Sequence, residues 1–500
     1  MIFKSACVTI LLLATFGIAN AQSNAGFENG LIGWLNTGKV TLTKDNTYSG
    51  NQCAAISSGS LFQRMRVSPL AIVQFDIYFK SAHRGDKVYA FLRFYNKKRQ
   101  LLIDYRNKSV DTINYIKTGN YTEAPPDAGY MEIGVMKDSG SGLVYVDDLK
   151  VDADVDRHKN DHAPLVNLDQ YMRPFWKSDT IYNETVLLYS RHGGIASGEL
   201  LYQPDHILSV KSFDLKTTFT RGKDYAVEGN VIERLSGSAT PFRADTSFDT
   251  KNDLAWFNTQ SQWVVVTYTH RDKWTGPEPP YKGNLLPLTI SKLRSKKPLR
   301  IVAYGMSITR GLNISSYDTV PPYMPTYVSL FARQLRKAYH NPSIKLYNAG
   351  LPGSAVDWGA QYADKYVNPL KPDLVILDFG MNDFWRLTPD QFKGYMETIV
   401  KKIKAADPKV EIILISNMKF DPEYVLLNDK YKSFYEGNIE GYSHVLKEME
   451  TKGIINLDMY GLSAFIYDRK KAKDCISNPL HPNDYLARWF AQGLSALLIR

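Results

Sequence analysis

Apolar residues change their spacing near residue 298, and the change separates two kinds of predicted structure. Before that point, runs such as 72–79 and 88–95 alternate apolar and polar side chains and are separated by clusters of Gly, Asn, Asp and Ser. This alternation is typical of strands with one buried face in a sandwich or barrel. After it, short apolar runs alternate with helical patterns, which predicts a parallel sheet covered by helices on both faces.

Two β-rich regions are expected before the change, at residues 24–152 and 165–295. In the second, strands are predicted at 185–189, 206–210 and 263–268, and Gly229-Asn230 indicates a two-residue hairpin turn between 225–228 and 231–235. Residues 152–164 are polar and charged, which is typical of a linker. His158 and His162 in it have the spacing of a helical metal pair, but without a third ligand in register we interpret them as part of a solvated linker.

The loop at 270–281 combines adjacent prolines with Trp274 and Tyr281. Its aromatic side chains either brace a domain interface or contact a sugar substrate in a cleft, and bracing is the slightly favoured interpretation.

The C-terminal region, 298–500, carries five predicted strands and four predicted helices. The strands are expected at 299–304, 344–347, 374–379, 411–416 and 453–457, and the helices at 323–339, 389–406, 441–451 and 483–498. Ligands of such sheets bind at the carboxyl ends of the strands.

Four short segments place chemistry at that edge. Ser307 lies in Gly-Met-Ser after the first strand, Gly353 in Asn-Ala-Gly-Leu-Pro-Gly after the second, and Asn382 in Gly-Met-Asn-Asp after the third; His481 precedes the last helix. Each has a structural explanation, because Ser and Asn cap helices and Gly adopts positive φ. Together they offer a nucleophile, oxyanion donors and a base for acyl transfer.

This constellation resembles the SGNH (GDSL-like) hydrolase superfamily over residues 298–500. The resemblance implies that Ser307 is the nucleophile, that His481 is the general base, and that the Ser307 and Gly353 N–H groups and the Asn382 amide form the oxyanion hole. Two positions depart from the pattern. Met306 stands where the family often has Asp, and Asn478 stands where an Asp usually precedes the histidine by three residues.

The Asn478 departure leaves the group that orients His481 open. In a serine protease triad, an Asp-to-Asn change costs about 10⁴ in rate. Asn478 can orient the ring by hydrogen bonding; otherwise a backbone carbonyl or another acid such as Asp474 or Asp484 does so, or the site works as a Ser–His dyad.

The order of the regions adds to the resemblance. The segments that open and close 24–152 resemble jelly-roll carbohydrate-binding modules, although such sandwiches also serve as spacers. The expected architecture is two N-terminal β-sandwich or jelly-roll-like domains followed by an α/β/α SGNH-hydrolase domain with a parallel sheet, similar to multidomain carbohydrate acetylesterases. It implies deacetylation of a glycan, and a plant cell-wall polysaccharide or its oligosaccharides is the first expectation for the substrate. The alternatives are a sialic-acid or other O-acetyl esterase, a general lipase or esterase, and a glycan-binding protein with an inactive hydrolase domain.

The N-terminus and composition bear on localisation and partners. Residues 1–21 have the charged start, apolar centre and Ala-Asn-Ala end of a cleaved signal peptide, so we expect a periplasmic or secreted protein. The net charge of +10 is compatible with binding to acidic material, and equally with surface lysines that only keep the protein in solution. Besides Cys7 in the signal segment, only Cys53 and Cys475 occur, and a bridge between them is not expected. No nucleic-acid motif, metal cluster or phosphate loop is visible, so no cofactor is expected.

Overall fold

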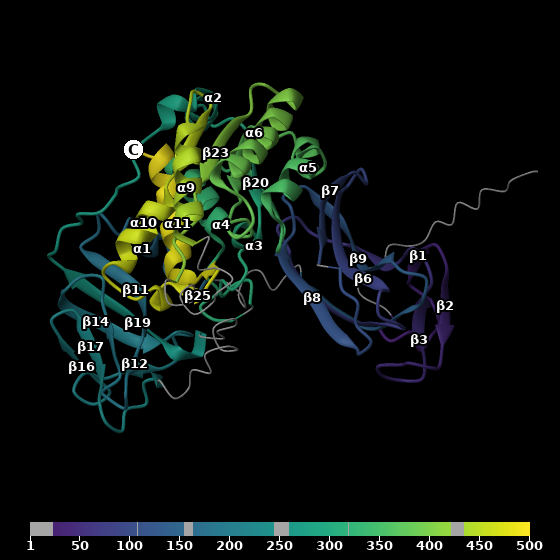
Figure 1. Ribbon diagram of the computed structural model, residues 1–500, viewed down its shortest axis with the longest axis horizontal. Helices are drawn as coiled ribbons and strands as arrows, with labels where there is room; N and C mark the ends of the chain where they lie inside the picture. Colours follow the sequence, from purple (N-terminus) through teal and green to yellow (C-terminus); the bar gives the residue numbers. More distant parts are fainter. Residues whose placement is uncertain (1–23, 108, 155–163, 245–259, 319, 422–434) are drawn as a thin grey trace, which may run out of the picture.

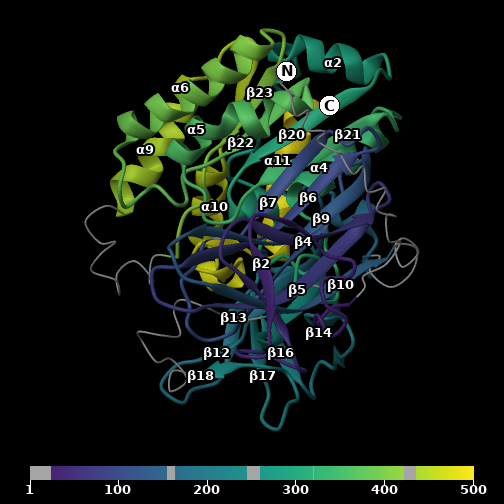
Figure 2. The same ribbon diagram turned by 90° about the vertical axis from the view of Figure 1, so that its right-hand side faces the viewer.

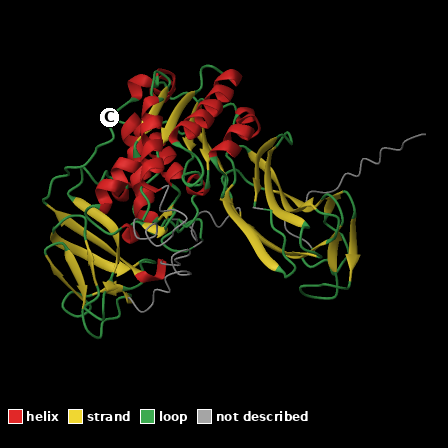
Figure 3. Cartoon of the chain, viewed as in Figure 1, coloured by secondary structure: helices red, strands yellow, loops and turns green. Residues whose placement is uncertain are grey.

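The computed structural model describes residues 24–107, 109–154, 164–244, 260–318, 320–421 and 435–500. The predicted signal peptide and the His158–His162 pair lie outside the described residues. In Figure 1, a C-terminal part in green and yellow lies between an N-terminal β-rich part and a middle β-rich part. Helices are concentrated in the C-terminal part (Figure 3).

The N-terminal part consists of two five-stranded antiparallel sheets. One has the order β1 (Leu35–Thr37), β4 (Ser60–Arg66), β9 (Ala128–Ser139), β6 (Lys87–Asn96), β7 (Leu101–Arg106). The other has the order β2 (Val40–Thr43), β3 (Cys53–Ile56), β10 (Val144–Asp154), β5 (Ile72–Ser81), β8 (Ile116–Glu123). In β6, Val88, Ala90, Leu92 and Phe94 are fully buried on one face, but Tyr89 and Phe91 on the other face are buried too, so the strand is less one-sided than its predicted alternation. The jelly-roll arrangement of this part stays a prediction.

The middle part begins with helix α1 (Leu168–Tyr171) and has two further sheets. One contains β11 (Thr180–Leu187), β19 (Trp263–His270), β14 (Pro204–Ser212) and β15 (Thr218–Phe219). The other contains β16 (Tyr225–Glu228), β17 (Val231–Arg234), β13 (Ser197–Glu199), β12 (Tyr189–Ser190) and β18 (Arg243–Ala244). The predicted hairpin is confirmed, since β16 pairs antiparallel with β17 and Gly229 has the positive φ of 57° that such a turn requires.

A five-stranded parallel sheet forms the centre of the C-terminal part. Its order is β21 (Ile344–Gly350), β20 (Leu299–Gly305), β22 (Leu374–Asp378), β23 (Glu411–Ile415), β24 (Ile454–Leu457). All five predicted strands are confirmed. After β20 the chain adds β21 on one side of that strand and then crosses over to add β22 on the other side. Strand order therefore reverses at β20. A crevice is expected outside the carboxyl ends of the strands at such a point.

Helices cover both faces of this sheet. They are α2 (Pro287–Arg294), α3 (Ser307–Arg310), α4 (Tyr327–Ala338), α5 (Val356–Tyr366), α6 (Pro389–Ala406), α9 (Tyr435–Glu448), α10 (Met459–Tyr467) and α11 (Asp484–Leu498). Helices α5, α6 and α9 pack together on one face, whereas α4 and α11 pack on the other (Figure 2). Helix α2 falls inside the range predicted for the second β-rich region, yet its first turn binds the Glu411 carboxylate of β23 through two backbone N–H groups.

Both β-rich parts contact the C-terminal part directly. Asp127 of the N-terminal part bonds Lys345 and Tyr347 of edge strand β21. Phe175 of the middle part stacks on Trp489 of α11 with ring centroids 4.4 Å apart. In the described part of the chain, no helix is long and apolar enough to cross a membrane.

Candidate active site

Ser307 begins α3 directly after β20, at the carboxyl edge of the sheet. The preceding Gly305 is needed there, because a Cβ on it would lie 2.3 Å from the Asp378 carbonyl oxygen. Ser307 is largely buried, with 6% of its surface exposed, and its Oγ lies 2.7 Å from His481 Nε2. The pair predicted from residues 174 positions apart is therefore in hydrogen-bond contact.

His481 is held by a small hairpin just before α11. Strand β25 (Ile476–Asn478) pairs antiparallel with β26 (His481–Pro482), which sets Asn478 opposite His481. Asn483 then caps α11 by accepting from the Tyr485 and Leu486 N–H groups. Burial lowers the pKa of the His481 imidazole to about 4, because the charged ring would lose its solvation. The ring is therefore neutral at neutral pH.

Asn478 is the group that contacts the other ring nitrogen of His481. Its Oδ1 lies 3.0 Å and its Nδ2 2.8 Å from Nδ1. The Leu480 N–H donates to Oδ1 at 2.9 Å, and Nδ2 donates to Asn313 Oδ1 at 2.8 Å. With the amide held this way, Oδ1 can accept the Nδ1 proton, which leaves Nε2 free to accept from the Ser307 hydroxyl.

The acids considered as alternatives lie elsewhere. The Asp484 carboxylate accepts from the backbone and hydroxyl of Ser315 at 2.8 and 2.6 Å. The Asp474 carboxylate accepts from the Leu187 N–H of the middle part at 2.6 Å and lies 3.8 Å from Lys470 Nζ. Both carboxylates thus bind other groups and not the His481 imidazole, although both lie close to His481 in the sequence.

Gly353 and Asn382 lie in the loops that follow β21 and β22. Gly353 has φ of 76°, and a Cβ there would meet no atom within 4 Å, so this backbone faces open space. The Asn382 side chain donates to the Ser354 carbonyl at 2.7 Å and lies 3.9 Å from the Met306 sulfur. The Ser354 hydroxyl in turn bonds the Gly305 carbonyl at 3.1 Å. The three predicted motif segments are thereby linked around Ser307.

Trp274 and Tyr281, offered as substrate contacts, are placed away from this pair. Trp274 packs on Phe465 and on Trp489, with ring centroids 4.5 and 5.4 Å apart. Tyr281 stacks under the Arg500 guanidinium at 4.6 Å. Its neighbour Lys282 bonds the Leu497 carbonyl at the end of α11 opposite His481. Their positions correspond to the bracing interpretation.

Three residues that support the segment around Ser307 were not singled out from the sequence. Asp378, at the end of β22, is fully buried and accepts from Thr309 Oγ1 and the Tyr327 hydroxyl, both at 2.8 Å. Burial raises the pKa of the Asp378 carboxyl to about 6, against the lowering effect of those two hydroxyls. An acid that ends an apolar strand was the available signal. Within the described residues, no three His, Cys, Asp or Glu side chains could together hold a metal ion.

Comparison with known families decides the class of this domain. Residues 303–488 match the model of the GDSL-like lipase/acylhydrolase family. This part of the chain is a GDSL-like lipase/acylhydrolase domain. The match covers Ser307, Gly353, Asn382 and His481, and the domain is called the hydrolase domain below.

Solved structures similar to the chain include two esterases and a binding module. A catalytic mutant of Axe2, an acetylxylan esterase from Geobacillus stearothermophilus, is 20% identical over 41% of this chain and 99% of its own, with a TM-score of 0.33. A two-domain esterase active on acetylated mannans is 19% identical over 42% of this chain, with a TM-score of 0.33. The chain spans about half of that protein, 52%. A family 16 carbohydrate-binding module is 16% identical over 26% of this chain and 97% of its own, with a TM-score of 0.23. No curated protein matches the chain.

Proposed function

We propose that the protein is a serine esterase that removes O-acetyl groups from a polysaccharide or oligosaccharide, with plant cell-wall glycans as the first substrates to test. The observation that carries the proposal is the 2.7 Å contact between Ser307 Oγ and the neutral, buried imidazole of His481. A serine hydroxyl is a weak nucleophile until such a base accepts its proton. The same contact opposes a purely glycan-binding role with an inactive hydrolase domain.

The proposed reaction follows the geometry of the site. Ser307 Oγ attacks the acetyl carbonyl carbon while its proton passes to His481 Nε2. The oxyanion is stabilised by the N–H groups of Ser307 and Gly353 and by the Asn382 amide. His481 then returns the proton to the departing sugar oxygen, which leaves an acetyl-serine ester. Water, activated by His481, attacks that ester and releases acetate and free Ser307.

The carbohydrate part of the proposal is supported by the β-rich parts that flank the hydrolase domain. The N-terminal part exposes aromatic side chains, among them Tyr48, which is 46% exposed and stacks on Tyr78 at 4.0 Å. Rings presented in this way offer apolar faces with a polar tip, to which the C–H faces of sugars are complementary. We also propose that the protein acts outside the cytoplasm, where acetylated polysaccharides are found.

The test is acetate release by the full chain and by Ser307→Ala. We expect the wild-type protein to release acetate from 4-nitrophenyl acetate and from at least one of acetylated xylan, xyloglucan, pectin, mannan and sialoglycans, and Ser307→Ala to lose this activity. Ser291→Ala, at an exposed position of helix α2, is the matched control and should retain it. Unchanged turnover in Ser307→Ala would contradict the nucleophile assignment, and preference for long-chain 4-nitrophenyl esters would identify a lipase instead.

A further inference from the structure

Helix α3, which presents Ser307, is only one turn long. A helix of four residues is not stable by itself, because nucleation is unfavourable and few backbone bonds form. Its position must therefore be fixed by contacts of its side chains and carbonyls. Thr309 is anchored inside the hydrolase domain by Asp378, as described above. A further contact involves the last residue of the helix, Arg310.

Arg310 meets a tyrosine of another part of the chain. Its guanidinium carbon lies 3.4 Å from the ring centroid of Tyr105, which belongs to β7 of the N-terminal part. Arg310 and Tyr105 are both buried, with 3% of each exposed. A cation held over an aromatic face away from water is a strong contact of its kind. The nucleophile helix is thus packed directly against the N-terminal part.

The hydroxyl of Tyr105 reaches the second motif segment. It donates to the Asn348 carbonyl of β21 at 2.5 Å. The Asn348 side chain accepts from the Gly350 N–H at 3.0 Å and donates to the Thr309 carbonyl of α3 at 2.8 Å. Asn348 therefore connects α3 to the end of β21, from which the chain leads to Gly353. Tyr105 contacts both connected segments, α3 through Arg310 and β21 through the Asn348 carbonyl.

We propose that Tyr105 is a positioning residue of the esterase site, supplied by the N-terminal part and acting on Ser307 through Arg310 and on Gly353 through Asn348. This inference rests on the proposed function. A tyrosine so placed limits movement of the nucleophile relative to the oxyanion donors, and displacements of about 1 Å can cost about 100-fold in rate. The N-terminal part then contributes to turnover of small esters as well as to any binding of glycan.

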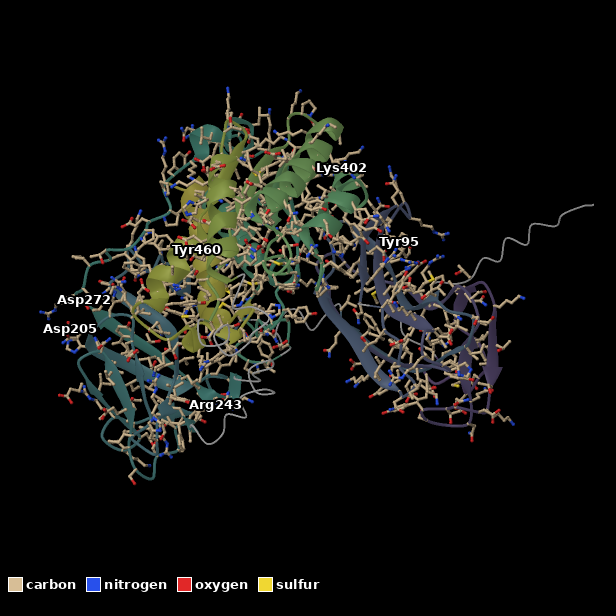
Figure 4. All side chains as sticks on the ribbon, in the orientation of Figure 1. Tyr95, Asp205, Arg243, Asp272, Lys402 and Tyr460 are labelled. Carbon is tan, nitrogen blue, oxygen red and sulfur yellow. The ribbon has the colours of Figure 1, made fainter. Side chains whose placement is uncertain are left out.

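A second contact between the same two parts provides the matched control. Asp127 bonds Lys345 Nζ at 2.5 Å and the Tyr347 hydroxyl at 2.6 Å, on the same strand β21 but before Asn348. Lys345 lies three residues before Asn348, about 10 Å along an extended strand, and Tyr347, which directly precedes Asn348, has its side chain on the opposite face of the strand. Asp127→Asn therefore weakens docking of the N-terminal part without touching α3. Tyr95→Phe is a further control, because Tyr95 (labelled in Figure 4) bonds Glu132 within the N-terminal part.

The experiment compares full-length Tyr105→Phe, Tyr105→Ala, Asp127→Asn and Tyr95→Phe with the wild type. Hydrolysis of 4-nitrophenyl acetate gives kcat and KM, and phosphonylation of Ser307 by a fluorophosphonate reports the acylation step. Tyr105→Phe keeps the ring under Arg310 and loses one hydrogen bond, so kcat should fall about fivefold. Tyr105→Ala should lower kcat by about 50-fold with KM within about twofold. Both controls should stay within about twofold of wild type.

Each outcome decides the proposal. Wild-type kcat in Tyr105→Phe and Tyr105→Ala would overturn it, and so would an equal fall of kcat in Asp127→Asn, which would indicate docking in general. If Tyr105→Ala does not fold, Tyr105→Phe decides, with thermal unfolding as the check on folding. Activity that survives Ser307→Ala would instead refute the proposed function, which separates the two failures.

Discussion

Asn478 gives His481, the proposed base, an electrostatic environment different from that of a histidine paired with a carboxylate. Both amide atoms of Asn478 lie within hydrogen-bond distance of His481 Nδ1, so a neutral amide can satisfy either tautomer of the ring. A carboxylate accepts only, and its charge also stabilises the imidazolium that forms during acylation. With the amide, the buried ring is oriented without charge compensation, and its pKa is low because of burial alone.

The pH dependence of Asn478→Asp tests this view. In the wild-type protein kcat/KM should fall only as the pH drops through the His481 pKa of about 4, because the neutral ring is the active form. A carboxylate at position 478 favours the charged ring, so the acid limb of kcat/KM should move up by about one pH unit or more. Asn478→Ala is the control. It should lower kcat and leave the acid limb of kcat/KM at the same low pH as in the wild type. An acid limb that does not move in Asn478→Asp would show that His481 is not the titrating base.

At the scale of residues, the sequence was sufficient to predict the side chains that belong to motifs. It was insufficient to predict the side chains that support them. Ser307 and His481 were predicted to meet, and they do. Asn478 was one of several candidates for orienting the ring, and only the hairpin geometry selected it. Tyr105 could not be found, because nothing in its own segment indicates which domain it will face.

At the scale of elements, the site is built from loops whose backbone is held in unusual conformations. Gly353 has a positive φ of 76° in the loop after β21, and Gly380 has φ of 123° after β22. A side chain at Gly380 would also collide with Asn417, 2.4 Å away, whereas Gly353 has room for one. Gly353 is therefore required for its backbone conformation rather than for lack of space.

Substitution of Gly353 by Ala isolates that backbone effect. A left-handed conformation costs a non-glycine residue about 1–2 kcal/mol, so the loop should relax and move its N–H from the oxyanion position. We expect kcat for 4-nitrophenyl acetate to fall about 100-fold, near the loss of one oxyanion donor. Gly394→Ala in α6 is the matched control, since a Cβ there meets no atom within 4 Å and Ala favours helix, so it should leave kcat unchanged. Equal activity in the two variants would remove Gly353 from the oxyanion hole.

Helix α6 was predicted from the sequence, and helix α5 was not. Helix α6 agrees with its prediction because Thr388 and Gln391 form a capping box and Pro389 stands in the first turn. Helix α5 was not predicted, because Gly359 stands inside its sequence and glycine disfavours a helix interior. In the structure Gly359 lets the Phe379 ring pack so closely that a Cβ would lie 2.7 Å from it.

At the scale of the whole molecule, the middle part is joined to the hydrolase domain by buried charge. Lys470 Nζ lies 2.5 Å from Glu184 Oε1, and both side chains are fully buried. Glu184 also accepts from the Tyr268 hydroxyl at 2.7 Å and from the Leu201 N–H at 2.8 Å. Lys470 lies shortly before the hairpin that carries His481, so this ion pair helps to hold the base from the side of the middle part.

Removing one charge of that pair should destabilise the protein strongly. Lys470→Met leaves the Glu184 carboxylate buried without its cation, which typically costs about 3–5 kcal/mol. Thermal unfolding of the variant should begin well below that of the wild type. Lys393→Met is the control, because its partner Glu448 is 62% exposed and such pairs contribute about 0–1 kcal/mol. Similar unfolding temperatures for the two variants would show that the buried pair contributes little.

The position of α11 in the chain has a consequence for synthesis. It follows every other described element, yet it lies in the interior, packed on α4 and on the middle part. Domains generally fold in order as the chain leaves the ribosome. The strands of both β-rich parts can therefore have left the ribosome while the parallel sheet still lacks one of the two helices on that face. His481 emerges just before that helix, so a nascent chain lacks the proposed base until nearly the whole hydrolase domain has been made.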